Sequence, residues 1–313
     1  MNSFGRIFRV SIFGESHGNG VGVLIDGCPA GLPLLQEDFL DDLKRRQGGN
    51  QKGTTPRKED DIPFLQTGVF NERTSGSPLN IYFENKNTRS SDYEKQRAIP
   101  RPGHADFVAG KKFGGYEDFR GGGHFSGRLT AGIVAAGVVA KKLLKTFNIE
   151  NPITVEANII EIGGEKDLEK GLQRAIDAKD SVGGIVECVT KGLPIGLGEP
   201  FFDSVESLIS HMVFAIPAVK GIEFGSGFQA AKMFGSVHND AIMDDTGKTS
   251  TNNAGGITGG ITNGNELVFR IAVKPTSSTP KLQKSLNTES GKVEEFSIKG
   301  RHDLCIALRV PVI

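Results

Sequence analysis

The sequence lacks tryptophan and has few cysteines, the residues that build disulfide frameworks and many metal centres. Its 313 residues include three cysteines, Cys28, Cys188 and Cys305, which lie far apart and are odd in number. This spacing disfavours both a metal site and a disulfide framework. We therefore predict no metal and a reducing compartment.

The chain also lacks net charge and a long apolar run. Lysine plus arginine equals aspartate plus glutamate at 37 each, which argues against a non-specific nucleic-acid binder but leaves acidic substrates open. The longest apolar run, 129–140, is much shorter than the ~20 residues that span a bilayer. The N-terminus shows no apolar region typical of a secretory signal. We expect a cytoplasmic protein that binds neither nucleic acid nor membrane.

Glycine, in contrast, is abundant. The 42 glycines are nearly twice the usual share of roughly 7%, and their spread predicts many tight turns and close backbone approaches. Residues 101–130 concentrate them around Gly121–Gly123 and place Ser126 before a long apolar segment. A hydroxyl and free N–H groups at a helix start can face an anion. This stretch therefore predicts a site for a phosphate-bearing cofactor or substrate.

Hydrophobic periodicity predicts a mixture of strands and helices without a repeat or a clear linker. The expected helices are 36–47, 126–147, 167–178 and 203–215, and the second is apolar on all faces, which is typical of a buried helix. The glycine clusters 114–127 and 255–264 are candidates to face one site. The expected strands are 4–13, 20–26, 62–70, 78–84, 153–160, 184–190, 266–274 and a last strand within 300–313.

Histidines on stiff turns are candidates for proton transfer. His17 lies between Ser16 and Gly18, and His104 follows Arg-Pro-Gly. A lone histidine in a turn is more often a surface residue, but flanking glycines favour a site, and imidazole titrates near pH ~6.5. The pair His302 and Asp303 is either a solvated cluster or a third side of the same site.

Three other segments look like phosphate or nucleotide motifs. Residues 274–278 form either a polar cradle or an ordinary strand-terminating turn, with equal weight. Residues 246–250 fail the phosphate-loop pattern because Ile242 stands where glycine is required. Residues 225–230 match the dinucleotide fingerprint but lack a surrounding βαβ unit. A nicotinamide oxidoreductase is therefore only a minor alternative.

Nine motifs in order give the chain a more specific resemblance. Over almost its whole length the sequence resembles the chorismate synthase family. The matching motifs are FGESHG at 13–18, DLKRR at 42–46, TTPRKE at 54–59, NKNTRSSDY at 85–93, RPGHADF at 101–107, RGGG at 120–123, NNAGGITGGI at 252–261, KPTSS at 274–278 and GRHDLC at 300–305.

The resemblance implies a fold, a reaction and an assembly. The implied fold is α+β, a single domain over 1–313 built as a β-α-β sandwich with helices between antiparallel sheets, assembled as a homotetramer. The implied enzyme is a carbon–oxygen lyase that eliminates phosphate and a ring proton, in anti-1,4 relation, from 5-enolpyruvylshikimate 3-phosphate to give chorismate. The family uses reduced FMN without net redox change, and NADPH is a candidate reductant of the flavin.

The resemblance also implies residue roles. His17 would protonate the departing phosphate, His104 would hold the protonation state of reduced flavin, and Asp303 would relay a proton through the flavin ring. Cations for the substrate or NADP would be Arg46, Lys52, Arg101 and Arg128, where paired hydrogen bonds favour arginine. The flavin-contact positions would be His124, Phe125, Ser126, Pro217, Ala218, Gly259, Lys274, Pro275, Thr276, Ser277, Ser278 and Arg301.

The sequence departs from the family pattern at several of these positions. Residues 124–128 read His-Phe-Ser-Gly-Arg where Arg-Ser-Ser-Ala-Arg is common, and Lys52 replaces an arginine. Pro217 replaces an asparagine, Leu304 replaces a proline, and the family's usual C-terminal helix does not follow the final Val-Pro stretch. A flavin- or nucleotide-binding module without turnover is therefore the second hypothesis.

Overall fold

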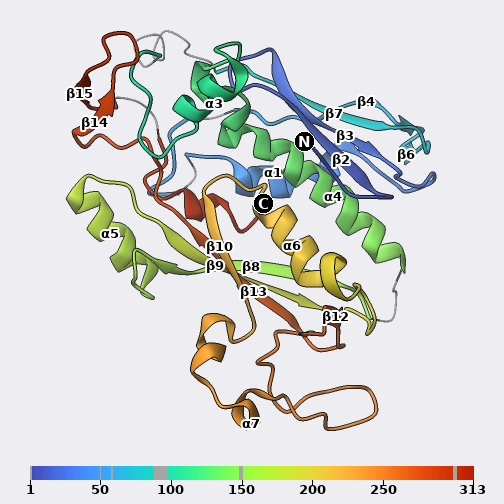
Figure 1. The fold of residues 1–313 in the computed structure, drawn as a ribbon. Helices are drawn as coiled ribbons and strands as arrows, with labels where there is room; N and C mark the ends of the chain where they lie inside the picture. The colour runs from blue at the N-terminus through green and yellow to red at the C-terminus, as the bar shows by residue number, and fades with distance from the viewer. Residues whose placement is uncertain (1, 50, 58, 88–96, 148–150, 299–301) are drawn as a thin grey trace.

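The structure is a computed structural model that describes residues 2–49, 51–57, 59–87, 97–147, 151–298 and 302–313 (Figure 1). It contains α-helices and sheets in which every described strand pairing is antiparallel. The predicted α+β class is therefore confirmed. The more specific sandwich arrangement stays a prediction.

The first sheet has five strands in the order β1-β2-β3-β7-β4. Its central strand β3 is buried at most positions, because β2 and β7 pair with its edges and a helix covers one face. The strands are β1 (Ser3–Phe4), β2 (Arg9–Gly14), β3 (Gly20–Asp26), β7 (Leu79–Glu84) and β4 (Phe64–Thr67). The expected strand 4–13 is thus two strands, and 62–70 divides into β4 and β5 (Val69–Phe70).

The helix that covers this sheet is α4 (Thr130–Phe147), which contacts β2, β3 and β7. A Cβ at Gly132 would lie 2.9 Å from the carbonyl oxygen of Gly22, so glycine lets the helix approach the strand closely. The predicted buried helix is confirmed, but it begins at Thr130 after a short 3-10 turn, η3 (Gly127–Leu129). The hydroxyl of Ser126 caps that turn by accepting from the Arg128 N–H.

The second sheet has four strands in the order β10-β13-β9-β8. Helix α5 (Leu168–Ala178) packs on β8, and α6 (Val205–Val213) packs on β10. Apolar side chains of these elements form a second core beneath the helices. The strands are β8 (Thr154–Ile162), β9 (Gly184–Lys191), β10 (Val219–Phe224) and β13 (Leu267–Val273).

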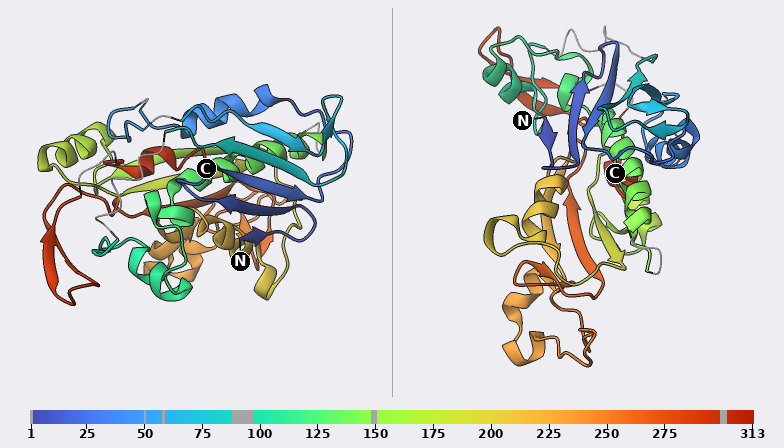
Figure 2. Two further views of the ribbon diagram at one scale, coloured as in Figure 1. Left: turned by 90° about the horizontal axis from the view of Figure 1, so that it is seen from above. Right: turned by 90° about the vertical axis from the view of Figure 1, so that its right-hand side faces the viewer.

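Shorter elements lie between the strands of each sheet, between the two sheets and after the second sheet. The segment around α7 and β12 projects from the rest of the chain (Figures 1 and 2). Within the described part of the chain, no helix is long and apolar enough to cross a membrane. These shorter elements are η1 (Gln36–Phe39), α1 (Leu40–Arg46), β6 (Arg73–Thr74), α3 (Asp106–Phe113), η2 (Arg120–Phe125), η4 (Phe201–Asp203), η5 (Gly227–Lys232), α7 (Gly235–His238), β11 (Ile257–Thr258), β12 (Ile261–Thr262), β14 (Gln283–Leu286), β15 (Val293–Phe296) and η6 (Ile306–Arg309).

Two sequence-based expectations need correction here. The predicted last strand is wrong, because 306–309 is the 3-10 helix η6. The chain turns back at this point, and Arg309 Nη1 donates to Asp303 Oδ2 at 3.0 Å. The glycine cluster 255–264 contains the β11–β12 hairpin, and none of its residues lines the cavity to which 114–127 contributes. The two clusters therefore do not face one site.

Candidate active site

A cavity of about 650 Å³ lies where segments of both sheets meet, and its volume is within the roughly 300–1,000 Å³ range of small-molecule sites. Segments that are distant along the chain form its lining: β1, β2, the end of α1 with 47–48, 55–61, 101–105, 121–136, α6, 215–218, 274–278 and 302–309. The sequence-predicted residues that line it are Arg46, Arg101, His104, His124, Phe125, Ser126, Arg128, Pro217, Ala218, Lys274, Thr276, Ser277, Ser278 and Asp303.

The structure does not bring every predicted residue to the lining. Lys52 Nζ donates to Gln173 Oε1 at 2.8 Å, on the side of α5. Gly259 lies in the turn between β11 and β12. Of the described residues, Lys52, Pro275, Gly259 and His17 are not among those that line the cavity. Arg301 lies outside the described residues.

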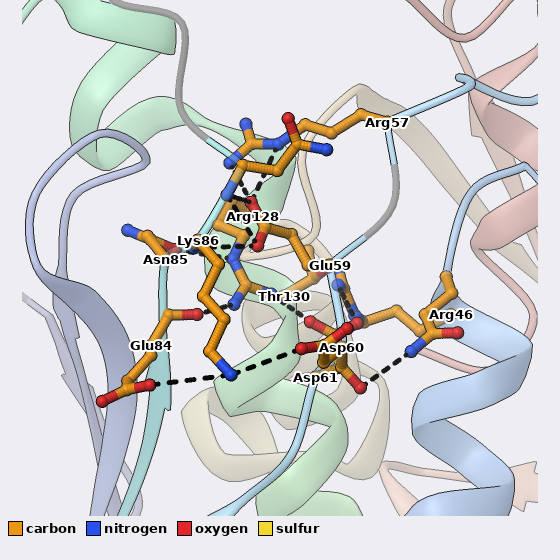
Figure 3. A network of polar contacts seen from close by, with 12 residues as sticks. Arg46, Arg57, Glu59, Asp60, Asp61, Glu84, Asn85, Lys86, Arg128 and Thr130 are labelled. Carbon is orange, nitrogen blue, oxygen red and sulfur yellow. Dashed lines mark hydrogen bonds and ion pairs between the residues drawn. The ribbon is translucent and has the colours of Figure 1, made fainter.

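Two arginines share one buried carboxylate beside the cavity (Figure 3). Arg46 Nη2 donates to Asp61 Oδ2 at 2.6 Å, and Arg128 Nη1 pairs with Asp61 Oδ1. The arginine side chains are 3% exposed and that of Asp61 is 0% exposed. Burial opposes ionisation of Asp61, but the two guanidinium groups outweigh it and hold the pKa of this carboxyl below its usual value.

Other contacts fix the planes of the two guanidinium groups. Arg128 Nε donates to Asn85 Oδ1 at 2.9 Å, and its Nη2 donates to the Glu84 carbonyl at 3.1 Å. Arg46 Nη1 donates to Thr130 Oγ1 at 3.2 Å. Arg46 Nε is buried, and no partner for it exists in the described part of the chain. The arginine pair is therefore rigid, with hydrogen-bonding capacity left over.

A second ionic cluster joins Arg101, His104 and Asp106. Arg101 donates to Asp106 through Nε at 2.7 Å and Nη2 at 2.8 Å, and His104 Nδ1 lies 2.5 Å from Asp106 Oδ1. Burial raises the pKa of Asp106, but hydrogen bonds from Arg101 and His104 outweigh it and hold that pKa well below its usual value. Since an ionised carboxylate only accepts, Nδ1 is the protonated nitrogen of His104.

The triple glycine lets the two predicted catalytic histidines, His17 and His104, pack against the same stretch of backbone. A Cβ at Gly121 would lie 2.4 Å from Cδ2 of His17, and one at Gly122 would lie 3.3 Å from Nε2 of His104. Both glycines have positive φ, +60° and +82°, a region that side chains disfavour. The backbone at 121–122 therefore contacts both imidazoles, and His17 lies buried directly behind the lining residue Gly121.

His17 lies in a cationic environment. Ser16 Oγ accepts from Arg57 Nη1 at 3.2 Å, and Arg57 pairs with Glu59 at 2.7 Å. Burial lowers the pKa of His17, and the charges of Arg57 and Arg120 lower it further. The imidazole is therefore neutral at pH 7 in the ligand-free protein.

Asp303 anchors the C-terminal side of the cavity. Its Oδ1 accepts from the Thr55 N–H at 2.9 Å and its Oδ2 accepts from Arg309, which in turn donates to the Arg46 carbonyl at 2.7 Å. The neighbouring His302 also lines the cavity. Burial and then the charge of Arg101 lower the pKa of His302 to about 4.

Polar side chains among the predicted flavin-contact residues bind one another and nearby backbone. Lys274 Nζ donates to Ser277 Oγ at 2.7 Å, and Ser277 Oγ donates to the Gly103 carbonyl at 2.7 Å. Burial, then the charge of Lys220, lowers the pKa of Lys274. His124 Nδ1 lies 2.9 Å from the Gly14 carbonyl oxygen. These contacts of 274–278 lie within the segment or reach Gly103, so the cradle interpretation stays a prediction.

Sequence reasoning missed several lining residues. Arg57 and Glu59 lie inside the TTPRKE motif, so the motif itself could have indicated them. His302, which the sequence offers as part of a solvated cluster or of a third side of the site, does line the cavity. Asp61 carries no signal in the sequence, because its partners come from positions 46 and 128, which are distant along the chain.

A cavity lined by five arginines, with His17 and His104 against its glycine wall, has the charge that suits an anionic small molecule, in an α+β fold. Comparisons with known proteins are more specific. The family model described as chorismate synthase matches residues 8–313. The chain belongs to the chorismate synthase family.

Individual members of the chorismate synthase family are similar to this chain over most of its length. Chorismate synthase of Chitinophaga pinensis is 70% identical over 313 residues, which cover 100% of this chain and 92% of the relative. That of Methanocaldococcus jannaschii is 42% identical, with 99% and 92% covered. A crystal structure of chorismate synthase aligns with a TM-score of 0.68 and 29% identity, covering 86% of this chain and 84% of the other.

Proposed function

We propose that this chain converts 5-enolpyruvylshikimate 3-phosphate to chorismate by anti-1,4-elimination of phosphate and a ring proton. The observation that carries the proposal is the convergence of Arg46, Arg101 and Arg128 with His104 on one cavity, with His17 behind its wall. The substrate presents a phosphate and carboxylates, and guanidinium forks match both groups. The reaction is the last step of the shikimate pathway and belongs to aromatic amino acid biosynthesis.

His17 is proposed as the acid for the departing phosphate. Its pKa is lowered in the ligand-free protein by burial and by Arg57 and Arg120. A phosphate dianion placed among those cations would offset their charge and favour the imidazolium. Substrate binding would thus load the proton onto His17 only when the leaving group that accepts it is present.

His104 is proposed to hold the protonation state of the reduced flavin. Asp106 fixes the hydrogen on Nδ1, so Nε2, which accepts from Arg101 Nη2 at 3.2 Å in the ligand-free protein, is the nitrogen that would exchange a proton. Asp303 is proposed as a further proton carrier. Its two oxygens accept from Thr55 and Arg309, which fix its orientation beside His302.

The residues present fit a reduced FMN. Thr276 Oγ1 is buried, and within the described residues it has no partner, which suits a ligand acceptor or donor in the 274–278 cradle. Ser126, Ala218 and Lys274 would hold the cofactor together with His124. When bound, reduced FMN supplies transient electron density that makes loss of phosphate feasible, with no net redox change. NADPH is proposed as its reductant.

The same family membership supports architectural proposals. These are a single domain over 1–313, the β-α-β sandwich, a homotetramer and a cytoplasmic location. The contacts of α4 with the first sheet and of α6 with the second support the sandwich.

One anaerobic assay tests the function. The chain is mixed with reduced FMN and 5-enolpyruvylshikimate 3-phosphate, and chorismate is followed by absorbance. We expect product that requires both reduced flavin and substrate. Tight flavin binding without product would support a binding module instead, and substrate-independent NADPH oxidation would support an oxidoreductase. The altered residues 124–125 motivate the binding-module alternative.

A further inference from the structure

The 59–61 segment adopts an unusual backbone at its end. Asp61 has φ +50°, in the left-handed region that residues other than glycine rarely occupy. Such positions persist where the surrounding structure determines them, and they gather at functional sites. The side chain of Asp61 is fully buried and the residue lines the cavity, so the strained backbone delivers a carboxylate to the site.

That carboxylate bridges cations from two separate elements. Arg46 is the last residue of α1, and Arg128 lies in η3 before α4. Each takes one oxygen of Asp61, as Figure 3 shows. Two buried guanidinium groups without a shared anion would repel each other in a medium of low dielectric. The single carboxylate therefore fixes the distance between the cations, and it sets their directions together with Asn85, the Glu84 carbonyl and Thr130.

The bridged pair retains capacity for a ligand. Arg46 is 2% exposed and lines the cavity, yet its Nε is buried and no described residue accepts from it. A buried N–H without an acceptor is unfavourable. Asp61 accepts from Nη2, Thr130 Oγ1 and the Gly127 carbonyl accept from Nη1, and Nε has no acceptor among the described residues.

We propose that Asp61 is the positioning residue that sets the spacing and orientation of Arg46 and Arg128 for the substrate's anionic groups. This inference rests on the proposed function. The proposed role of Asp61 involves no contact with reacting atoms or flavin, because it acts through the guanidinium groups of Arg46 and Arg128.

The test is Asp61→Asn with its neighbour Asp60→Asn as the matched control. Asparagine has the shape of aspartate and tolerates the left-handed backbone, so the substitution removes mainly the charge. We expect the dissociation constant and KM for 5-enolpyruvylshikimate 3-phosphate to rise at least about tenfold, the scale for truncating a buried charged pair. The dissociation constant for FMN should stay within about twofold, because its proposed contacts lie elsewhere.

The control changes the same functional group one residue away. Asp60 pairs with Lys86 at 3.3 Å, and its side chain is 64% exposed. Exposed pairs of this kind contribute little, so Asp60→Asn should bind substrate and FMN as the unmodified chain does. A purely structural role of Asp61 would instead weaken substrate and FMN binding together.

A second variant covers the case in which Asp61→Asn does not fold. The double variant Asp61→Asn with Arg128→Met removes one anion and one cation, so the buried cluster keeps its charge of +1, as two guanidinium groups minus one carboxylate gives. Its comparison is Arg128→Met alone. If Asp61 positions Arg46, the double variant should bind substrate several-fold more weakly than Arg128→Met.

The possible results separate this inference from the proposed function. If the unmodified chain makes no chorismate, the proposed function fails. If it does, and Asp61→Asn binds substrate within twofold of the unmodified chain, the positioning role is overturned. Equal substrate binding by the double variant and by Arg128→Met would overturn it as well.

Discussion

The cavity lining has a charged part, which includes Arg46, Arg101 and Arg128, and an apolar part, which includes Val10, Ile12 and Met212. Different forces hold the two parts in place. In the charged part, Asp61 and Asp106 each join two side chains through buried or half-buried ion pairs. In the apolar part, Val10, Ile12 and Met212 line the cavity, and His124 contacts the Gly14 carbonyl oxygen and Asn2 Oδ1. Removing one member of an ion pair leaves an uncompensated charge, whereas an apolar wall accepts substitution at lower cost.

This difference agrees with where the sequence departs from the family pattern. His124, Phe125 and Pro217 lie in the lining and differ from the residues usual in the family, whereas Arg46, Arg101 and Arg128 follow it. A charged network constrains several residues at once, so a single change in it is costly. The apolar part is therefore where we expect this chain to differ functionally from its relatives.

The largest predicted effect concerns the histidines that border the charged part. We expect His17→Ala and His104→Ala each to lower turnover by about 10²-fold or more, the usual scale for lost acid–base assistance. Steady-state rates with saturating reduced FMN measure this effect.

A control and a pH profile sharpen this prediction. His238→Ala, in α7 and away from the cavity, should leave turnover unchanged. Because burial and neighbouring cations lower the pKa of His17 in the ligand-free protein, the ionisation seen in kcat/KM should lie below 6.5, and the one seen in kcat should lie higher. Unmodified rates in both alanine variants would refute the assigned roles.

The second prediction concerns His302, whose protonation in the unfolded chain should lower the free energy of unfolding at acidic pH. The pKa of His302 is about 4 in the folded chain, below its ordinary 6.5. As pH falls from 6.5 towards 4, the unfolded chain binds a proton that the folded chain does not, so the free energy of unfolding falls. The loss approaches about 3 kcal/mol below pH 4 and is absent above 6.5.

The variant His302→Gln cannot take up this proton and should lack that loss. Urea unfolding at pH 7 and at about pH 4.5 gives the free energy of unfolding of each protein. We expect the difference between the two pH values to be smaller in the variant by most of that amount. An identical difference in both proteins would show that His302 is not a low-pKa group.

The sequence predicts some residues of the cavity lining much better than others. Ordered motifs indicated part of the lining, because Arg101, His104 and Ser278 lie in short segments whose residue types suggest their chemistry. Asp61 could not be found this way, because its contacts depend on where α1 and η3 meet in space. The predicted last strand failed for a related reason, since Asp303 and Arg309 close a local turn that alternation of apolar residues does not reveal.

The smallest predicted effect concerns the apolar part at position 124. His124 Nδ1 lies 2.9 Å from the Gly14 carbonyl oxygen and Nε2 lies 3.3 Å from Asn2 Oδ1. We expect His124→Arg to tighten FMN binding several-fold, because arginine adds a permanent cation and a planar fork for the phosphate of the flavin. His124→Gln, which keeps a donor without charge, should not tighten binding. Fluorescence titration at low and high salt measures both dissociation constants, and the gain should shrink as salt screens the charge. A dissociation constant for the arginine variant that matches the unmodified chain at every salt concentration would mean that position 124 does not face the flavin.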